Sequence, residues 1–260
     1  DVVYIGEQRL NFEVPGTLKV LCTYENWKAN YSDKAGFYPL IKNTDVTRFN
    51  SNDMFFVKHY AEDLSTEYLL DYPNAIVVLD SQHSNKTQLY RSIYLNFANN
   101  KINNPVIICS YPVIEDPETY QLWASSDLGS VLIDGFGDGV WLEGNQSTQL
   151  INASSFGILQ ATRSRISKTE YISCPSCGRT LFDLQETTAK IRSKTSHLKG
   201  LKIGIMGCIV NGPGEMADAD YGYVGTGPGK IHLYKEQTVV RKNIPEVEAV
   251  DELIQTAKKE

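Results

Sequence analysis

The stretch that organises the carboxy-terminal part of the chain runs from Tyr171 to Glu215. It opens with Ser173-Cys174-Pro-Ser-Cys177-Gly-Arg179 and closes with Gly207-Cys208-Ile-Val-Asn-Gly-Pro-Gly-Glu215. These two motifs hold three of the five cysteines of the chain. A C-x-x-C pair can bind one metal centre from a single tight loop, and an apolar run over residues 202–206 brings the third cysteine from a separate strand. Three soft thiolates suit an iron–sulfur cluster or zinc.

The fourth ligand has to come from another residue type. Glu215 follows Cys208 on a glycine- and proline-rich segment, which we expect to be a loop that is free to fold back. Three thiolates and one carboxylate oxygen would leave one iron of a cluster chemically distinct, which suits substrate binding better than electron transfer alone.

Three other interpretations of the cysteines stay open on residue chemistry. A structural zinc site needs a fourth nitrogen or sulfur, and His232 is the nearby candidate. A thioredoxin-like redox pair normally needs no third cysteine. A ferredoxin-like electron-transfer module usually has four thiolates, so the missing fourth cysteine counts against it.

The same motifs resemble a known family. Cys174-Pro-Ser-Cys177-Gly-Arg-Thr-Leu-Phe-Asp-Leu and Met206-Gly-Cys208-Ile-Val-Asn-Gly-Pro-Gly-Glu215 are similar to the carboxy-terminal domain of 4-hydroxy-3-methylbut-2-enyl diphosphate synthases. Residues 216–230 and the segment Asp134-Gly-Phe-Gly-Asp-Gly139 look like the long, three-domain form of that family. The resemblance is strong from about Leu132 onward and weak before it.

The resemblance implies a [4Fe–4S] cluster held by Cys174, Cys177, Cys208 and Glu215, with Glu215 also catalytic because it would yield its place to a substrate oxygen. It implies reductive opening of 2-C-methyl-erythritol 2,4-cyclodiphosphate in the methylerythritol phosphate pathway to isoprenoids, with electrons from ferredoxin or flavodoxin. The family's amino-terminal barrel, which binds the diphosphate, is not evident in this sequence. We therefore expect a carboxy-terminal piece of a longer enzyme that is inactive without that barrel.

Composition and charge fit this interpretation. The chain has 260 residues, 42% hydrophobic and 22% charged, with a net charge of −6, which argues against a nucleic-acid partner. No segment reaches the roughly 18–20 apolar residues of a membrane helix, and no signal peptide is visible. Cys22 and Cys109 lie in apolar, strand-like runs and are expected in the core. Free thiols indicate a reducing compartment, the bacterial cytoplasm or alternatively the plastid stroma.

Hydrophobic patterns predict an α/β protein with two domains. Residues 1–165 alternate apolar strands with helices, which is typical of a partial βα-barrel or an open parallel sheet. We expect this domain to be an insert that positions the second one. Helices are predicted over residues 63–70, 86–99, 116–128 and 148–163, and strands include residues 75–79, 105–111 and 130–134. Asp80 and Asp134 then follow strands, as ligand-binding or, more simply, helix-capping residues. His59 and His83 are expected on the surface or in loops.

Residues 166–260 are expected to form a small α+β iron–sulfur domain. Its pattern predicts a helix over residues 180–198, a buried strand over 201–206, further strands near 221–224, 230–234 and 238–241, and a closing helix over 246–258. The glycine-rich segment 225–229 is interpreted as a hairpin turn because it fits no phosphate-binding motif. Arg179 could pair with a carboxylate or lie near the phosphates of the substrate, and we expect a structural role first.

Overall fold

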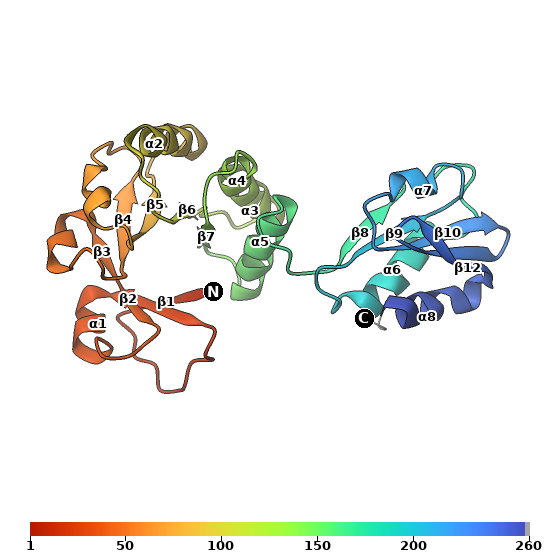
Figure 1. Ribbon diagram of the computed structural model, residues 1–260, viewed down its shortest axis with the longest axis horizontal. Helices are drawn as coiled ribbons and strands as arrows, with labels where there is room; N and C mark the ends of the chain where they lie inside the picture. The colour runs from red at the N-terminus through yellow and green to blue at the C-terminus, as the bar shows by residue number, and fades with distance from the viewer. Residues whose placement is uncertain (258–260) are drawn as a thin grey trace. The chain divides into compact units, whose positions relative to one another are not determined.

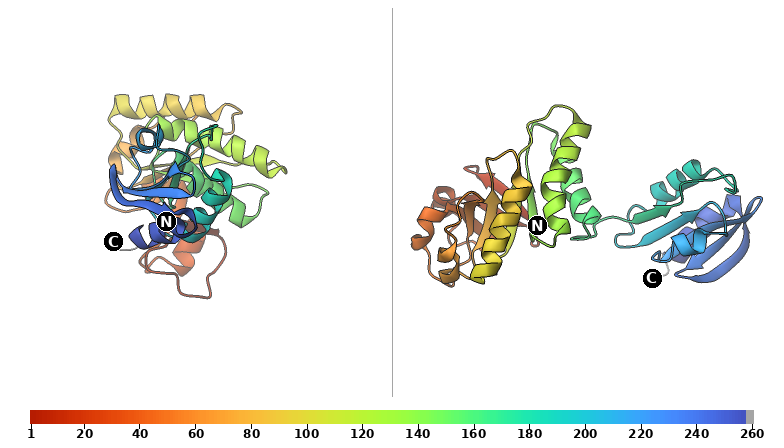
Figure 2. Two further views of the ribbon diagram at one scale, coloured as in Figure 1. Left: turned by 90° about the vertical axis from the view of Figure 1, so that its right-hand side faces the viewer. Right: turned by 90° about the horizontal axis from the view of Figure 1, so that it is seen from above.

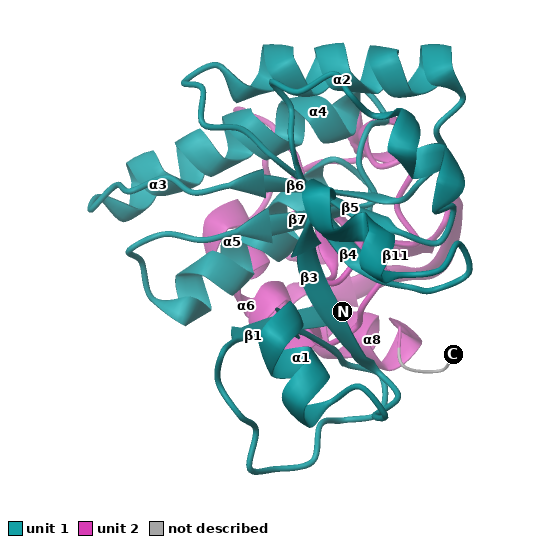
Figure 3. Ribbon diagram, turned by 90° about the vertical axis from the view of Figure 1, so that its left-hand side faces the viewer, with its two compact units in different colours: residues 1–164 teal, residues 165–260 magenta. Residues whose placement is uncertain are grey.

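The computed structural model describes residues 1–257 of the chain. They form two compact units, Asp1–Ser164 and the segment that begins at Arg165 (Figure 3). Each unit has its own sheet and its own buried clusters. No helix among the described residues combines the length and the apolar character that crossing a membrane requires.

Unit 1 is built on a parallel sheet whose seven strands follow one another in chain order (Figure 1). The strands are β1 (Val2–Gly6), β2 (Lys19–Thr23), β3 (Phe37–Lys42), β4 (Phe56–Tyr60), β5 (Ile76–Asp80), β6 (Val106–Ser110) and β7 (Gly139–Leu142). The rings of Tyr4 on β1 and Trp141 on β7 contact each other with their centroids 5.0 Å apart, so the two outermost strands approach. The sheet curves as part of a barrel, which confirms the predicted fold class.

Helices cover one face of this sheet (Figures 1 and 2). Side chains alternate between the two faces of a strand, so Val57 and Val77 pack with the helices while Phe56 and Val78 join Cys109 in a separate cluster on the other face. The helices are α1 (Tyr24–Asn30), α2 (Lys86–Asn100), α3 (Pro117–Ala124), α4 (Ser130–Ile133) and α5 (Thr148–Ala161), with 3-10 turns at Asn43–Arg48 and Glu67–Asp71.

The predicted strand over residues 130–134 is wrong. A π-helical turn, Ser125–Gly129, continues α3 directly into α4. The buried side chains Leu128, Val131 and Leu132 recur at helical spacing, and a short apolar run cannot be assigned to strand or helix by periodicity alone. Asp134 therefore follows a helix rather than a strand, and its carboxylate accepts a hydrogen bond from Arg91 at 2.6 Å.

Two smaller predictions for unit 1 also need correction. The helix expected over residues 63–70 is only the 3-10 turn Glu67–Asp71. His59 is fully buried on β4 rather than on the surface: its Nε2 lies 2.8 Å from the carbonyl oxygen of Asp63, and its Nδ1 lies 3.2 Å from the hydroxyl of Tyr68. These partners satisfy the imidazole locally and allow its burial. His83 is exposed after β5, as predicted.

Unit 2 is a five-stranded mixed sheet in the order β12-β11-β10-β9-β8. The strands are β8 (Glu170–Ser173), β9 (Lys202–Met206), β10 (Tyr221–Gly227), β11 (Lys230–Lys235) and β12 (Thr238–Pro245), with β8, β9 and β10 parallel and the last two antiparallel. Gly227 pairs with Lys230, so the glycine-rich segment is the predicted hairpin turn. Figure 1 shows α6 (Leu184–Thr195) and α8 (Glu246–Ala257) on one face of this sheet and α7 (Gly212–Glu215) on the other.

Helix α6 begins later than the predicted range of 180–198. Asp183 is its N-cap, and its side chain accepts a hydrogen bond from the backbone N–H of Glu186 at 2.8 Å. The residues before this cap belong to the loop that contains Cys174 and Cys177, where the N–H of Thr180 donates to the carbonyl of Cys177. The last residue of the predicted closing helix, Lys258, lies outside the described residues.

Candidate metal centre

The three cysteines of the two motifs follow neighbouring parallel strands. Ser173, the last residue of β8, pairs with Ile205 of β9, so the loops that carry Cys174 and Cys208 leave the same edge of the sheet. The carboxyl ends of parallel strands are the usual place for ligands in α/β sheets. The topology thus brings the starts of the two motifs, which are far apart in sequence, to the same edge of the sheet.

Cys174 is fixed by backbone contacts with the second motif. Its N–H donates to the carbonyl of Ile205 at 3.3 Å, and its Sγ accepts a hydrogen bond from the N–H of Gly207, also at 3.3 Å. The thiol is half-buried at the margin of the hydrophobic clusters of unit 2. An N–H directed at a ligating sulfur stabilises its negative charge.

Cys177 lies on an exposed turn that Thr180 organises. The Thr180 Oγ1 accepts hydrogen bonds from the N–H of Cys177 at 3.1 Å and from the hydroxyl of Ser176 at 3.2 Å. Ser176 itself has a left-handed backbone conformation with φ of 64°. The backbone N–H and then the guanidinium of Arg179 bond the Cys177 sulfur and lower the pKa of this thiol, which favours the thiolate.

The two motifs pack so closely that Gly207 leaves no room for a side chain. A Cβ atom on Gly207 would lie 2.7 Å from Thr180 Oγ1, and a Cβ atom on Gly225 would lie 2.5 Å from the carbonyl oxygen of Gly207. That carbonyl also accepts a hydrogen bond from the N–H of Leu181 at 3.1 Å. Thr180 and Gly207 therefore join the C-x-x-C loop to the strand that carries Cys208, a role the sequence analysis did not assign.

Glu215 is the last residue of α7, so the prediction that it lies on a free loop is wrong. The prediction of a loop rested on the segment Asn211-Gly-Pro-Gly214, whose residues are typical of a turn. Proline is, however, well tolerated in the first turn of a helix. The Glu215 side chain is exposed. Its carboxylate lies within electrostatic reach of Arg179, as do the sulfurs of Cys177 and Cys208, and these groups raise the pKa of the guanidinium.

The candidate ligands are three free thiols and one exposed carboxylate. Cys174 and Cys208 follow neighbouring strands, yet in the described part of the chain no three His, Cys, Asp or Glu side chains converge closely enough to hold one metal ion. His232, the candidate zinc ligand, lies on β11 with its Nε2 3.3 Å from Asn243 Oδ1. By their chemistry, soft thiolates suit an iron–sulfur cluster or zinc.

Comparison with known proteins places this site in a family. Residues 170–259 match the family model described as the GcpE protein C-terminal domain. Almost all of the second unit is therefore similar to the GcpE C-terminal domain. The match spans both cysteine motifs and Glu215, so the resemblance recognised from these motifs is confirmed.

Three of the curated relatives of the chain are longer proteins named 4-hydroxy-3-methylbut-2-en-1-yl diphosphate synthase (flavodoxin). The protein from Bacteroides fragilis (strain ATCC 25285) is 54% identical over 192 residues, which are 73% of this chain and 31% of the relative. That from Parabacteroides distasonis is 44% identical over 265 residues, 99% of this chain and 42% of the relative. The protein from Protochlamydia amoebophila is 44% identical over 228 residues, which are 88% of this chain and 32% of the relative. The chain therefore spans about a third to two fifths of these relatives.

The Parabacteroides alignment extends beyond the GcpE C-terminal domain. It covers 99% of the chain, so unit 1 as well as unit 2 has a counterpart in that relative. The sequence resemblance was weak before Leu132, because the first strands of unit 1 carry no motif that chemistry constrains. The two units thus occur together in one longer relative.

Next to the GcpE cysteine loop lies an open groove of about 810 Å³. It runs between this loop and α6, and its polar lining includes Thr188 and Arg192. The hydroxyl oxygen of Thr188 is buried and has no hydrogen-bond partner in the structure, while Arg192 lies over the ring of Tyr171 with 5.0 Å between its Cζ and the ring centroid. The groove belongs to the same edge as the cysteines.

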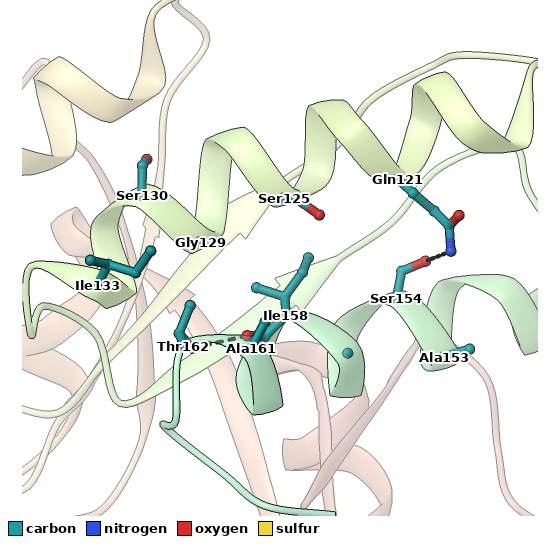
Figure 4. Close-up of a pocket in the computed structure, with 11 residues that line it drawn as sticks. Gln121, Ser125, Gly129, Ser130, Ile133, Ala153, Ser154, Ile158, Ala161 and Thr162 are labelled. Carbon is teal, nitrogen blue, oxygen red and sulfur yellow. Dashed lines mark hydrogen bonds between the residues drawn. The ribbon is translucent and has the colours of Figure 1, made fainter. Parts of the chain in front are cut away.

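A second hollow, of about 540 Å³, lies within unit 1 between the α3–α4 segment and α5 (Figure 4). It is lined mainly by small and apolar side chains, and Gln121 donates to Ser154 Oγ at its margin with a distance of 3.4 Å. Its lining contains no Cys, His, acidic or basic residue. We assign it no chemistry.

Proposed function

We propose that the chain is the carboxy-terminal part of a 4-hydroxy-3-methylbut-2-enyl diphosphate synthase, an oxidoreductase of isoprenoid biosynthesis. The observation that supports this proposal is that residues 170–259, which match the GcpE C-terminal domain, contain Cys174, Cys177, Cys208 and Glu215, and that Cys174 and Cys208 follow the neighbouring parallel strands β8 and β9. In this proposal unit 2 is the cluster-binding domain, and unit 1 is an insert that positions it.

The four residues are proposed to hold a [4Fe–4S] cluster. When bound, such a cluster supplies electrons and Lewis acidity at one site. Cys174 is held for this task by the N–H of Gly207, and Cys177 by Thr180 and Arg179. Glu215 has an exposed side chain, and a carboxylate can leave a ligand position more readily than a thiolate.

The proposed reaction opens a cyclic diphosphate by reduction. The substrate, 2-C-methyl-erythritol 2,4-cyclodiphosphate, takes up two electrons with protons; one ring C–O bond to phosphate breaks, a hydroxyl leaves as water, and an allylic diphosphate forms. We propose that an amino-terminal barrel domain holds the diphosphate, because a group with several negative charges calls for several basic side chains.

Flavodoxin or ferredoxin is the proposed electron donor, and the relatives' name, which specifies flavodoxin, supports the former. We place the enzyme in the bacterial cytoplasm, since the relatives named above are bacterial and three free thiols need a reducing compartment.

A chimeric enzyme tests the proposal. This chain would replace the matching 265-residue stretch of the Parabacteroides distasonis relative, and product formation from the cyclic diphosphate would be measured with reduced flavodoxin. We expect turnover by the chimera, none by the isolated chain, and none by a chimera carrying Cys208→Ser, because a lost thiolate ligand disrupts the cluster. A chimera that holds its cluster but forms no product, or an isolated chain that forms product, would contradict the proposal.

A further inference from the structure

Met216 occupies a slot that two glycines leave open in the sheet of unit 2. Gly204 of β9 and Gly222 of β10 are paired in register. A Cβ atom on Gly204 would lie 2.7 Å from the Cβ of Met216, and one on Gly222 would lie 2.5 Å from its Sδ and Cε. Met216 is 1% exposed. A side chain at Gly204 would clash with the Cβ of Met216, and one at Gly222 would displace the end of the Met216 side chain, so the slot and the methionine are matched in shape.

The other end of α7 is packed just as tightly. A Cβ atom on Gly212 would lie 2.7 Å from the Cβ of Met206 and 3.5 Å from Val224. Gly212 and Met216 are four residues apart, so they lie on the same side of this helical turn. The N–H of Met216 also bonds the carbonyl of Gly212 at 3.0 Å. The turn is thus attached to the sheet at both of its ends.

Glu215 lies in sequence between Gly212 and Met216, and its own side chain does not pack against the sheet. Its side chain is exposed, whereas its neighbour in sequence is buried in the sheet. Its backbone N–H bonds the carbonyl of Asn211 at 3.0 Å. The backbone of Glu215 is therefore fixed, and the freedom that remains is rotation of its side chain. A ligand that exchanges by side-chain rotation returns to the same place, which a loop that opens and closes does not guarantee.

We propose that Met216 is a positioning residue that fixes the backbone of Glu215, so that its carboxylate joins and leaves the cluster by side-chain rotation alone. This rests on the proposed function, since it takes Glu215 as the fourth ligand. Met216 acts through Glu215 and touches neither substrate nor cluster in this assignment.

Hydrogen exchange on the metal-free chain tests the first half of the proposal. Met216→Ala is expected to speed amide exchange in residues 211–217 by about tenfold or more, because local opening no longer has to remove a buried side chain from the sheet. Met216→Leu should restore slow exchange. Leu253→Ala is the matched control: Leu253 is equally buried but packs from α8 against the opposite face of the sheet, so exchange in residues 211–217 should stay unchanged.

A double-mutant cycle tests the second half. The chain and its variants would be loaded anaerobically with iron and sulfide, and the half-life of the cluster would be measured against an iron chelator. Residues that orient metal ligands typically affect affinity by about 10–100-fold, so we expect Met216→Ala to shorten the half-life by on the order of tenfold in the wild-type background. In a chain that already carries Glu215→Ala, Met216→Ala should shorten the half-life of the cluster no further, because both substitutions remove the same ligand. The electron paramagnetic resonance spectrum of reduced Met216→Ala should match that of Glu215→Ala.

The outcomes separate this inference from the function on which it rests. Equal effects of Met216→Ala in both backgrounds would show a merely structural role and overturn the assignment to Met216, with the cluster proposal intact. Gly204→Ala, whose added Cβ would lie 2.7 Å from the Cβ of Met216, should reproduce the effect of Met216→Ala, and a wild-type half-life in that variant would also count against the assignment. A chain that takes up no iron and sulfide would overturn the proposed function, and the role of Met216 with it.

Discussion

The five cysteines differ in environment: two are buried in the core of unit 1, and the three of the candidate site are accessible to solvent. Cys22 and Cys109 are fully buried on strands of unit 1, as their apolar surroundings in sequence predicted. Burial raises the pKa of Cys22 to about 11 and that of Cys109 to about 12. The thiols of Cys174, Cys177 and Cys208 are half-buried or exposed.

Thiol alkylation measures this division. At pH 8 the native, metal-free chain should react with iodoacetamide at three cysteines, while Cys22 and Cys109 stay unmodified, because they are inaccessible and their pKa values keep them protonated. Peptide mass spectrometry reads the sites. Denatured protein, in which all five should react, is the control. Rapid modification of Cys109 in the native chain would contradict the burial described here.

Residue types and spacing predicted the candidate ligands, because the chemistry of a C-x-x-C pair with a further cysteine is local in sequence. The residues that join the motifs were not predictable in this way. Thr180 and Met216 act through contacts with glycines that are distant in sequence, and no pattern in a single sequence marks such a pair. His59 was misplaced for a related reason, since its partners Asp63 and Tyr68 come together only in the fold.

At the scale of elements, the start of α6 depends on one side chain. Asp183 caps this helix in unit 2 just as Asp116 caps α3 in unit 1, where it bonds the N–H of Thr119 at 2.8 Å. N-cap aspartates satisfy a backbone donor that the helix itself leaves free. Each unit therefore contains one helix whose cap can be removed without touching the core.

Asp183→Ala should lower the free energy of unfolding of unit 2 by about 1 kcal/mol. Asp183→Asn should lower it by much less, because asparagine is also a good N-cap. All three tryptophans, Trp27, Trp123 and Trp141, belong to unit 1, so their fluorescence reports urea unfolding of that unit alone. Circular dichroism reports both units. We expect Asp183→Ala to shift a circular dichroism transition but not the fluorescence transition, and Asp116→Ala to shift the fluorescence transition. A fluorescence shift with Asp183→Ala would contradict the assignment of the cap to an independent unit.

Strongly periodic elements were predicted within a few residues, and short ones were not. The α2 helix carries its apolar residues at helical spacing over 15 residues, a pattern that only one element type satisfies. The residues of α4 form a run too short to distinguish strand from helix, and α7 is a single turn whose glycines and proline indicate a loop in sequence. In both cases packing on the sheet determines the helical conformation, and the residues that make these contacts are distant in sequence.

At the scale of the whole molecule, the sequence pattern predicted a parallel sheet, either part of a βα-barrel or open, followed by a small α+β domain, and a sheet of each kind is present. The order of strands in unit 1 follows from alternating strands and helices, since each parallel neighbour is reached by a crossover. The register that brings β8 and β9 together is what unites the cysteine motifs. The central claim is that this edge of the sheet carries an iron–sulfur cluster.

The most direct test is the iron, acid-labile sulfide and zinc content of the chain prepared without oxygen. The account predicts about four irons and four sulfides per chain, and loss of both when Cys174, Cys177 and Cys208 are replaced by alanine. One zinc per chain without sulfide, or an iron content that survives those replacements, would contradict it.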